Sequence, residues 1–364
     1  MSNIHDLAHF GQSIWYDNIS RSILDSGYMA RLIDLGIVGV TSNPAIFKKA
    51  IADSADYDDV IRALAAAGTP TADLYEALAL ADIGRAADLF APVYAASDGL
   101  DGYVSLEVNP ALAHDAAGTV AEARRLFAAL DRPNVMIKVP ATPAGVVAFE
   151  TLIAAGINVN VTLMFSLSHY EDIAQAYIRG LQQLAARGGD LRRVAAVASF
   201  FVSRIDTAVD AALSAAGEDA LLGKIAIANA KLAYGRFQDI GDSPAWQELA
   251  AQGARPQRLL WASTSTKNPA YPDTIYVDNL IGPQTVNTMP PATVDAFLDH
   301  GTLAETLTAD VDEAEEQIAY LDDLDIDFNA ITQQLQDDGV QAFADAFRAL
   351  LAALEAKQAA LQAA

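Results

Sequence analysis

The sequence contains no cysteine, and its 364 residues include 23 lysines and arginines against 47 aspartates and glutamates. A chain without cysteine forms neither disulfides nor zinc–cysteine sites, which fits the cytosol. Its formal net charge of −24 repels nucleic acid and anionic lipid, because both are bound mainly through basic side chains. We therefore expect a cytoplasmic protein that binds no nucleic acid.

Long apolar runs are also missing. No uninterrupted stretch reaches the roughly 18 residues that a transmembrane helix requires, and residues 1–15 lack the basic and apolar segments of a signal peptide. We expect no membrane association. Because 52% of the residues are hydrophobic, the chain is globular and has enough apolar side chains for one large domain or two.

Short apolar runs rich in β-branched residues alternate with longer Ala/Leu-rich segments that have the 3.6-residue period of helices. We predict strands at residues 13–17, 36–42, 102–108, 134–139, 157–165, 194–202, 258–264 and 273–280. Near-continuous hydrophobic strands alternating with helices indicate a parallel sheet covered on both faces. Eight such strands, each alternating with helical segments, predict an α/β fold of the closed (β/α)8 TIM-barrel type. An open doubly wound sheet is the alternative.

Two segments add helices to this pattern. The stretch between the second and third predicted strands, residues 43–101, is longer than one crossover helix and has helical periodicity at 56–68 and 74–94, with Pro70 in a turn between them. A helical tail begins near residue 290, and residues 322–339 precede a final helix at 340–362. We expect a single domain over 1–364, with the barrel at about 10–300 and a helical C-terminal extension at about 301–364.

The stretch "NVMIKVPATPAG" (134–145) places Lys138 inside an apolar run. Apolar surroundings favour the neutral amine over the ammonium, and a neutral lysine amine is a Schiff-base nucleophile. The alternative is a structural lysine that reaches solvent or pairs with a carboxylate. Two carboxylates, Asp17 and Glu107, end other predicted strands, although one would suffice for an ion pair.

Polar residues end most of the predicted strands. In a barrel these ends carry the chemistry, so the candidate site comprises Asp17, Thr41, Ser42, Asn43, Glu107, Lys138, Asn160, Thr162, Ser199, Arg204 and Ser263. A second carboxylate and a threonine that can hold a water suit the proton transfers of imine chemistry. No cluster of metal ligands appears among these residues, so we expect no metal.

Several motifs, in one order, resemble those of the transaldolase family. "GVTSNPAI" (39–46) resembles its first signature, and "IKVPATPAG" (137–145) its second, which carries the Schiff-base lysine. The resemblance extends from residue 10 to about 300 through "YDNISR" (16–21), "SLEVNP" (105–110), "NVNVTLMFS" (158–166) and "ASFFVSRID" (198–206). "WASTSTKNPAYPDT" and "TVNTMPPAT" are similar to the longer bacterial subgroup.

The resemblance implies a role for each catalytic candidate. Lys138 would form the imine with the ketose carbonyl, and Asp17 would take the proton of the C4 hydroxyl as the C3–C4 bond breaks. Glu107 and Thr162 would act through a water in making and breaking the imine. The implied enzyme transfers a dihydroxyacetone unit from sedoheptulose 7-phosphate to glyceraldehyde 3-phosphate, and needs no cofactor. The products are erythrose 4-phosphate and fructose 6-phosphate, and the reaction also runs in reverse.

The resemblance also implies the substrate-binding residues. Asn43 and Asn160 would hold the hydroxyls and the three-carbon intermediate, with Thr41, Ser199 and Phe201 lining the site, and Arg204 and Ser263 would bind the distal phosphate. Shorter transaldolases have a phosphate-binding arginine at the position of Ser265. We expect Lys267, the nearest cation, to replace it, unless Lys267 is merely a solvated loop residue.

Two other functions remain open. Fructose 6-phosphate aldolases are related enzymes that release free dihydroxyacetone, but they carry Tyr where this chain has Phe201, which favours transfer. A barrel that binds sugar phosphates without turnover would lack Lys138, Asp17 or Glu107, and this chain has all three. We expect sugar phosphates as partners and a monomer or a homodimer as the assembly.

Overall fold

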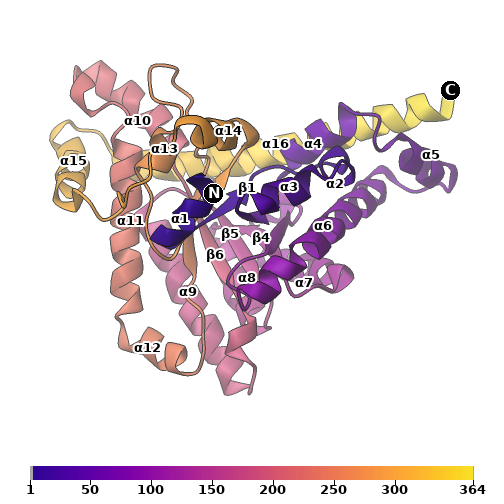
Figure 1. Ribbon diagram of the computed structural model, residues 1–364, viewed down its shortest axis with the longest axis horizontal. Helices are drawn as coiled ribbons and strands as arrows, with labels where there is room; N and C mark the ends of the chain where they lie inside the picture. The colour runs from indigo at the N-terminus through magenta and orange to yellow at the C-terminus, as the bar shows by residue number, and fades with distance from the viewer. Residues whose placement is uncertain (1–2, 364) are drawn as a thin grey trace.

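The barrel is closed by eight parallel strands. The computed structural model describes residues 3–363, and in it each strand pairs with the next and β8 pairs with β1. This confirms the predicted TIM barrel and excludes the open sheet. Figure 1 shows the strands at the centre of the fold. The strands are β1 (Gln12–Tyr16), β2 (Ile37–Val40), β3 (Tyr103–Glu107), β4 (Val135–Pro140), β5 (Val159–Met164), β6 (Ala196–Phe201), β7 (Arg258–Ala262) and β8 (Thr285–Met289).

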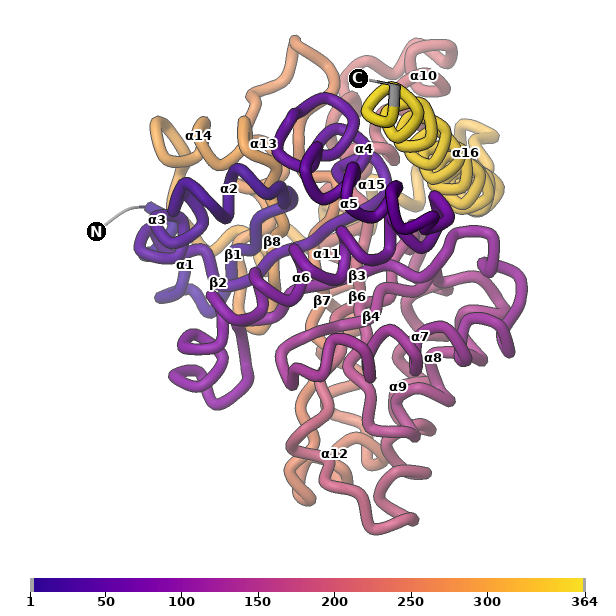
Figure 2. The backbone as a smooth tube through the Cα atoms, turned by 90° about the vertical axis from the view of Figure 1, so that its right-hand side faces the viewer, coloured from indigo at the N-terminus to yellow at the C-terminus, as the bar shows by residue number. Residues whose placement is uncertain are grey.

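Helices surround the barrel on its outside (Figure 2). They are α1 (Asn3–Leu7), α2 (Arg21–Asp25), α3 (Tyr28–Asp34), α4 (Pro44–Ala52), α5 (Asp58–Ala66), α6 (Thr71–Ala96), α7 (Ala116–Leu130), α8 (Pro143–Ala154), α9 (Leu167–Ala186), α10 (Ser203–Ala216), α11 (Ile225–Gly241), α12 (Pro244–Ala251), α13 (Ile275–Asp278), α14 (Pro291–His300), α15 (Val311–Asp323) and α16 (Phe328–Ala363), with the 3-10 turns η1 (Ala8–Phe10), η2 (Pro110–Leu112), η3 (Leu191–Arg193) and η4 (Asp219–Leu221). None of the helices within residues 3–363 is long and apolar enough to cross a membrane.

The strands read as continuous apolar runs because both of their faces are covered. Every residue of β4, β5 and β6 is buried, on one side by the barrel interior and on the other by the surrounding helices. The extra helices after β2 are also confirmed, since α4, α5 and α6 occupy that segment and Pro70 immediately precedes α6.

The eighth strand was predicted at the wrong place. Residues 273–280 contain the short helix α13, whereas the strand is β8. Its sequence, "TVNTM", has few apolar residues, yet all five residues are buried. The side-chain oxygens of the strand are hydrogen-bonded, whereas Asn287 Nδ2 has no partner among the residues that the structure describes. Gln12 Nε2 donates to Thr285 Oγ1 at 3.0 Å, and Thr264 Oγ1 donates to Asn287 Oδ1 at 3.0 Å. A search for apolar runs therefore misses this strand.

The C-terminal helix begins earlier than predicted. Residues 328–339 belong to α16, which continues through Gly339 without a break. A Cβ at Gly339 would lie 2.8 Å from Leu163 Cδ2, so the glycine allows the helix to approach the end of β5. Figure 1 shows α16 in yellow, running across one end of the barrel.

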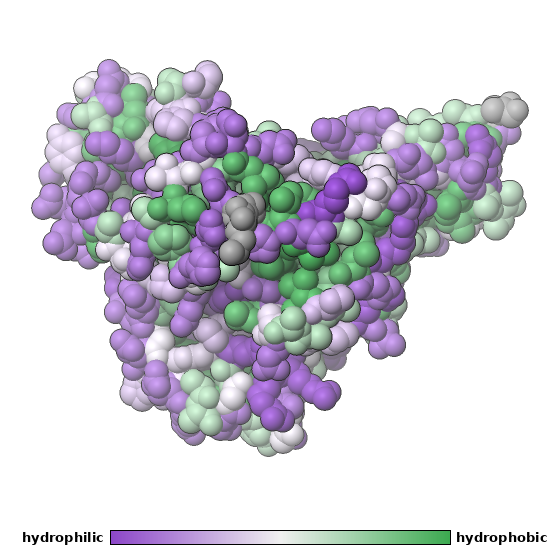
Figure 3. Space-filling view, in the orientation of Figure 1, coloured by the Kyte–Doolittle hydropathy of each residue, from purple (hydrophilic) through white to green (hydrophobic). Residues whose placement is uncertain are grey.

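Beyond the barrel, α16 continues past the structures it covers. Its last turns lie alongside α5, where Lys357 Nζ forms an ion pair with Asp58 at 2.8 Å. Figures 1 and 3 show these two helices as an arm that projects from the body, at the upper right of both views. Hydrophilic and hydrophobic residues are mixed on the face of the arm seen in Figure 3.

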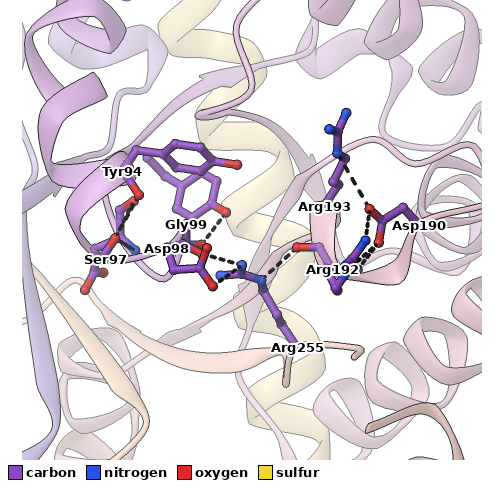
Figure 4. Close-up of polar contacts among 10 residues, drawn as sticks. Tyr94, Ser97, Asp98, Gly99, Asp190, Arg192, Arg193 and Arg255 are labelled. Carbon is purple, nitrogen blue, oxygen red and sulfur yellow. Dashed lines mark hydrogen bonds and ion pairs between the residues drawn. The ribbon is translucent and has the colours of Figure 1, made fainter. Parts of the chain in front are cut away.

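The opposite end of the barrel carries paired charges. Arg255 precedes β7 and donates through Nε to the carbonyl of Arg192 at 2.9 Å, and its guanidinium also bonds the carbonyl of Asp98, which precedes β3 (Figure 4). Arg192 in turn pairs with Asp190 at 2.9 Å. These contacts join the amino-terminal ends of three strands.

Candidate active site

Lys138 lies between two polar residues of neighbouring strands. In the sheet register it pairs with Glu107 on β3 and with Asn160 on β5. The residue is 6% exposed, and its amine lies 5.7 Å from the centre of the Phe343 ring on α16. Within the part of the chain that the structure describes, Lys138 forms no ion pair within 4 Å. The amine is therefore buried and not committed to one carboxylate.

Two carboxyl groups share the electrostatic environment of Lys138. Burial raises the pKa of Glu107 to about 7; the positive charge of Lys138 lowers it, and the charge of Asp17 raises it. Burial also raises the pKa of Asp17, against the opposing effects of Lys138, a hydrogen bond from Thr41, and Lys267. Glu107 thus titrates near neutral pH, where a group both donates and accepts protons most effectively.

Glu107 and Thr162 both have buried oxygens without partners. Glu107 Oε2 and Thr162 Oγ1 make no hydrogen bond to the residues that the structure describes. Such groups are rare in native proteins, and a catalytic role or a bound water is among their explanations. Next to Thr162, Leu163 has a φ of 64°, and the pairing of β5 with β6 shifts between Val161 and Met164. This irregularity at the end of the strand is typical of a functional site.

A chain of hydrogen bonds crosses the barrel interior beside Lys138. Asn160 Nδ2 donates to Ser105 Oγ at 3.1 Å, and Ser199 Oγ donates to Asn160 Oδ1 at 2.7 Å. Because Ser105 and Asn160 lie on strands separated by β4, their bond must run through the interior. The sequence analysis missed Ser105, although its position two residues before Glu107 places both on one face of the strand.

Asp17 is held by residues from two other strands. Thr41 Oγ1 donates to Asp17 Oδ1 at 2.7 Å and lies 2.6 Å from Thr288 Oγ1, which donates to it. Thr288 was missed because β8 was misplaced. Asn43 is the N-cap residue of α4, and its Oδ1 accepts a hydrogen bond from the backbone N–H of Ile46 at 3.0 Å. Its side-chain nitrogen is then the group that remains to donate to a ligand.

Two cations lie at one side of the site without carboxylate partners. Arg204 lies 5.3 Å from the centre of the Phe201 ring, and Lys267 Nζ donates to Ser265 Oγ at 2.5 Å. Loss of hydration and the charge of Arg204 lower the pKa of Lys267. Neither cation forms an ion pair within residues 3–363. Two such neighbours in an acidic chain attract an anion, and Ser263, whose Oγ lies 2.9 Å from Ser203 Oγ, is beside them.

Helix α16 covers the catalytic end of the barrel. Gln336, which is 2% exposed, donates from Nε2 to the carbonyls of Ala141 and Leu163, both at 3.0 Å. Ala141 directly follows β4 and Leu163 lies near the end of β5, so one amide ties together the ends of these two strands. The contribution of α16 was not predicted, because an amphipathic period does not show which surface a helix will cover.

The family model described as transaldolase/fructose-6-phosphate aldolase matches residues 14–354. The chain belongs to the transaldolase/fructose-6-phosphate aldolase family. "Transaldolase 2" of Nostoc sp. is 50% identical over 98% of both chains, and "Transaldolase" of Thiobacillus denitrificans is 50% identical over 97% of this chain and 99% of its own. "Transaldolase" of Neisseria gonorrhoeae is 49% identical over 97% of this chain and all of its own.

Family membership confirms the resemblance found in the sequence motifs. In this member of the transaldolase/fructose-6-phosphate aldolase family, the structure gathers the predicted residues at the ends of β1 to β7, from Asp17 round to Ser263. Lys267 extends this set beyond β7. Among residues 3–363, no group of three or more His, Asp or Glu side chains is placed to hold a metal ion.

Proposed function

We propose that this chain is a transaldolase, a transferase that moves a dihydroxyacetone unit between sugar phosphates through an imine on Lys138. The full-length similarity to proteins named transaldolase supports the activity. The observation that carries the mechanism is the buried, unpaired amine of Lys138 beside two carboxyl groups whose pKa values are raised. A purely structural lysine at this place would form an ion pair with one of them.

The first stage of the reaction makes the imine. The neutral amine of Lys138 attacks the C2 carbonyl of the donor ketose, and the resulting carbinolamine loses its hydroxyl as water. Glu107, with a pKa of about 7, supplies the proton for that leaving hydroxyl through a water held by Thr162. The unpartnered oxygens of Glu107 and Thr162 are the groups that bind this water.

The second stage breaks and remakes a carbon–carbon bond. Asp17 takes the proton of the C4 hydroxyl, the C3–C4 electron pair moves toward the imine nitrogen, and the aldose phosphate leaves. The enamine that remains on Lys138 then attacks the carbonyl carbon of the acceptor aldehyde, and Asp17 returns the proton to the new hydroxyl. Hydrolysis of the imine releases the product ketose. Asn43 and Asn160 hold the three-carbon unit throughout, with Thr41 and Ser199 around it.

The phosphate of donor and acceptor binds at Arg204, Lys267 and Ser263. A guanidinium and an ammonium without carboxylate partners give this part of the site a local positive charge within an acidic protein. Phosphate binding here would place the reacting carbons of a sugar chain deeper in the barrel, toward Lys138. The enzyme would work as a metal-free, cytoplasmic protein of one domain, as a monomer or a homodimer.

The alternative activity is release of free dihydroxyacetone, as in a fructose 6-phosphate aldolase. That outcome requires water to hydrolyse the three-carbon imine before an acceptor aldehyde arrives. Phe201 supports transfer, because its ring packs 5.1 Å from that of Phe165 and carries no hydroxyl to assist a water. An aldolase would release dihydroxyacetone from fructose 6-phosphate without an acceptor, and a transaldolase would not.

The substitution Lys138→Arg tests the nucleophile. Arginine keeps the positive charge but stays protonated, so it supplies no neutral amine. We expect transfer between fructose 6-phosphate and erythrose 4-phosphate to fall below about a thousandth of the wild-type rate. Lys48→Arg, at an exposed lysine of α4, is the matched control and should retain full activity. If the Lys138→Arg variant kept a rate above this limit, catalysis would not require an imine at this position.

A further inference from the structure

A second pocket lies outside the barrel, far from Lys138. It has a volume of about 460 Å³ and is lined by residues of α9, α11, α12 and the segments that lead into β7 and β8. These segments mark the amino-terminal end of the barrel, opposite the catalytic end (Figure 1). A volume of this size is within the range of small-molecule sites.

Aromatic rings form much of the pocket wall. Tyr177 of α9 stacks with Trp246 of α12, with ring centres 6.3 Å apart and 25° between the planes. Tyr234 and Phe237 of α11 stack in the same way, at 5.7 Å and 24°. All four rings line the pocket. Phe149 also stacks on Tyr177, with ring centres 6.1 Å apart and 14° between the planes, so Trp246, Tyr234 and Phe237 are the rings whose remaining faces can receive a planar ligand.

Gln257 brings a polar group to this aromatic pocket. It is 4% exposed, and neither its amide nitrogen nor its carbonyl oxygen has a hydrogen-bond partner among the residues that the structure describes. The next residue, Arg258, turns into the barrel and donates to Ser13 Oγ at 2.7 Å. Since side chains alternate along a strand, Gln257 faces outward, toward the pocket that it lines.

An unpartnered buried amide is costly to keep. A buried polar atom without a hydrogen-bond partner destabilises the fold, and a leucine of similar shape would avoid that loss of stability. Gln257 therefore weakens the fold unless a ligand uses its donor and its acceptor. The two groups lie side by side, so their complement is a molecule with an adjacent acceptor and donor. Glutamine makes such a paired contact with adenine, through its exocyclic amine and a neighbouring ring nitrogen.

The charge of the pocket limits further which ligands can bind. Among the described residues that line it, Asp242 alone carries a charge, and this carboxylate repels phosphate but accepts hydrogen bonds from sugar hydroxyls. We propose that the pocket binds an uncharged adenine nucleoside, with the base stacked on the aromatic rings and paired with Gln257. This site is independent of the transferase reaction proposed for the barrel.

Fluorescence of Trp246 reports on binding directly. The chain has three tryptophans, and Trp15 and Trp261 are both 0% exposed, so Trp246 is the one that a ligand in the pocket would contact. We expect adenosine to change the emission of Trp246 along a saturation curve with a Kd below about 1 mM, an ordinary affinity for a small neutral ligand. Adenosine monophosphate and purine riboside, which lacks the exocyclic amine, should each bind at least about tenfold more weakly.

Two variants test the role of the amide and of the pocket. Gln257→Leu should weaken adenosine binding at least about tenfold while leaving the transfer rate unchanged. Ala250→Leu should have the same effect by filling the pocket, and it leaves the amide in place. Gln238→Leu is the matched control, since Gln238 also lines the pocket but is exposed. The proposal is wrong if wild type shows no response to about 10 mM adenosine, or if both Gln257→Leu and Ala250→Leu bind it like the wild type.

Discussion

The substitution Glu107→Gln should change how stability depends on pH. Burial raises the pKa of Glu107 to about 7 from its ordinary value of 4.5. Between these two values the folded protein holds a proton that the unfolded chain has lost, so the free energy of unfolding falls as the pH rises from about 4.5 to about 7. A difference of this size corresponds to about 3 kcal/mol. Glutamine does not titrate, so the substitution removes this pH-dependent loss of stability.

The assay is chemical denaturation of both proteins at several pH values between 4 and 8. We expect the free energy of unfolding of Glu107→Gln, relative to wild type, to increase across this range by as much as about 3 kcal/mol. Comparing the two proteins at each pH cancels the other titrating groups. The same substitution should lower the activity, because imine formation should become about 10²- to 10⁴-fold slower. A stability difference that stays constant with pH would refute the assigned environment of Glu107.

Three further substitutions separate the remaining roles. In the Asp17→Ala variant, borohydride should trap the intact six-carbon ketose on Lys138, and transfer should be about 10²- to 10⁴-fold slower. If the three-carbon adduct still formed at the normal rate, the base would be another residue. Lys267→Ala should raise KM about tenfold or more with little change in kcat, whereas Lys48→Ala should leave KM unchanged; equal KM values would make Lys267 a solvated loop lysine. Gln336→Leu should lower both kcat and the denaturation midpoint, and an unchanged kcat would mean that the amide serves stability alone.

The barrel could be predicted because most of its strands can be recognised from their own short stretches of sequence. Strands buried on both faces must be apolar, and β4, β5 and β6 show this directly in the sequence. The last strand is an exception, because it is polar and its side-chain oxygens are hydrogen-bonded to residues far away in the chain. Thr285 bonds Gln12, more than 270 residues earlier. No local pattern contains that information.

The site was predictable to a similar degree. Residues at strand ends, such as Lys138 and Glu107, could be found because a parallel barrel brings all such ends to one face. The covering residues could not, because Gln336 and Phe343 reach the site only through the path of α16 across the barrel. On that path the helix passes close to β5 at Gly339, where a Cβ would lie 2.8 Å from Leu163 Cδ2.

The most direct test of the account is the identity of the residue that carries the imine. The enzyme is incubated with fructose 6-phosphate, reduced with borohydride, digested and analysed by mass spectrometry. The account predicts a reduced three-carbon unit on Lys138 in wild type and its absence in Lys138→Arg. A stable adduct on any other lysine, or turnover without any reducible intermediate, would contradict it.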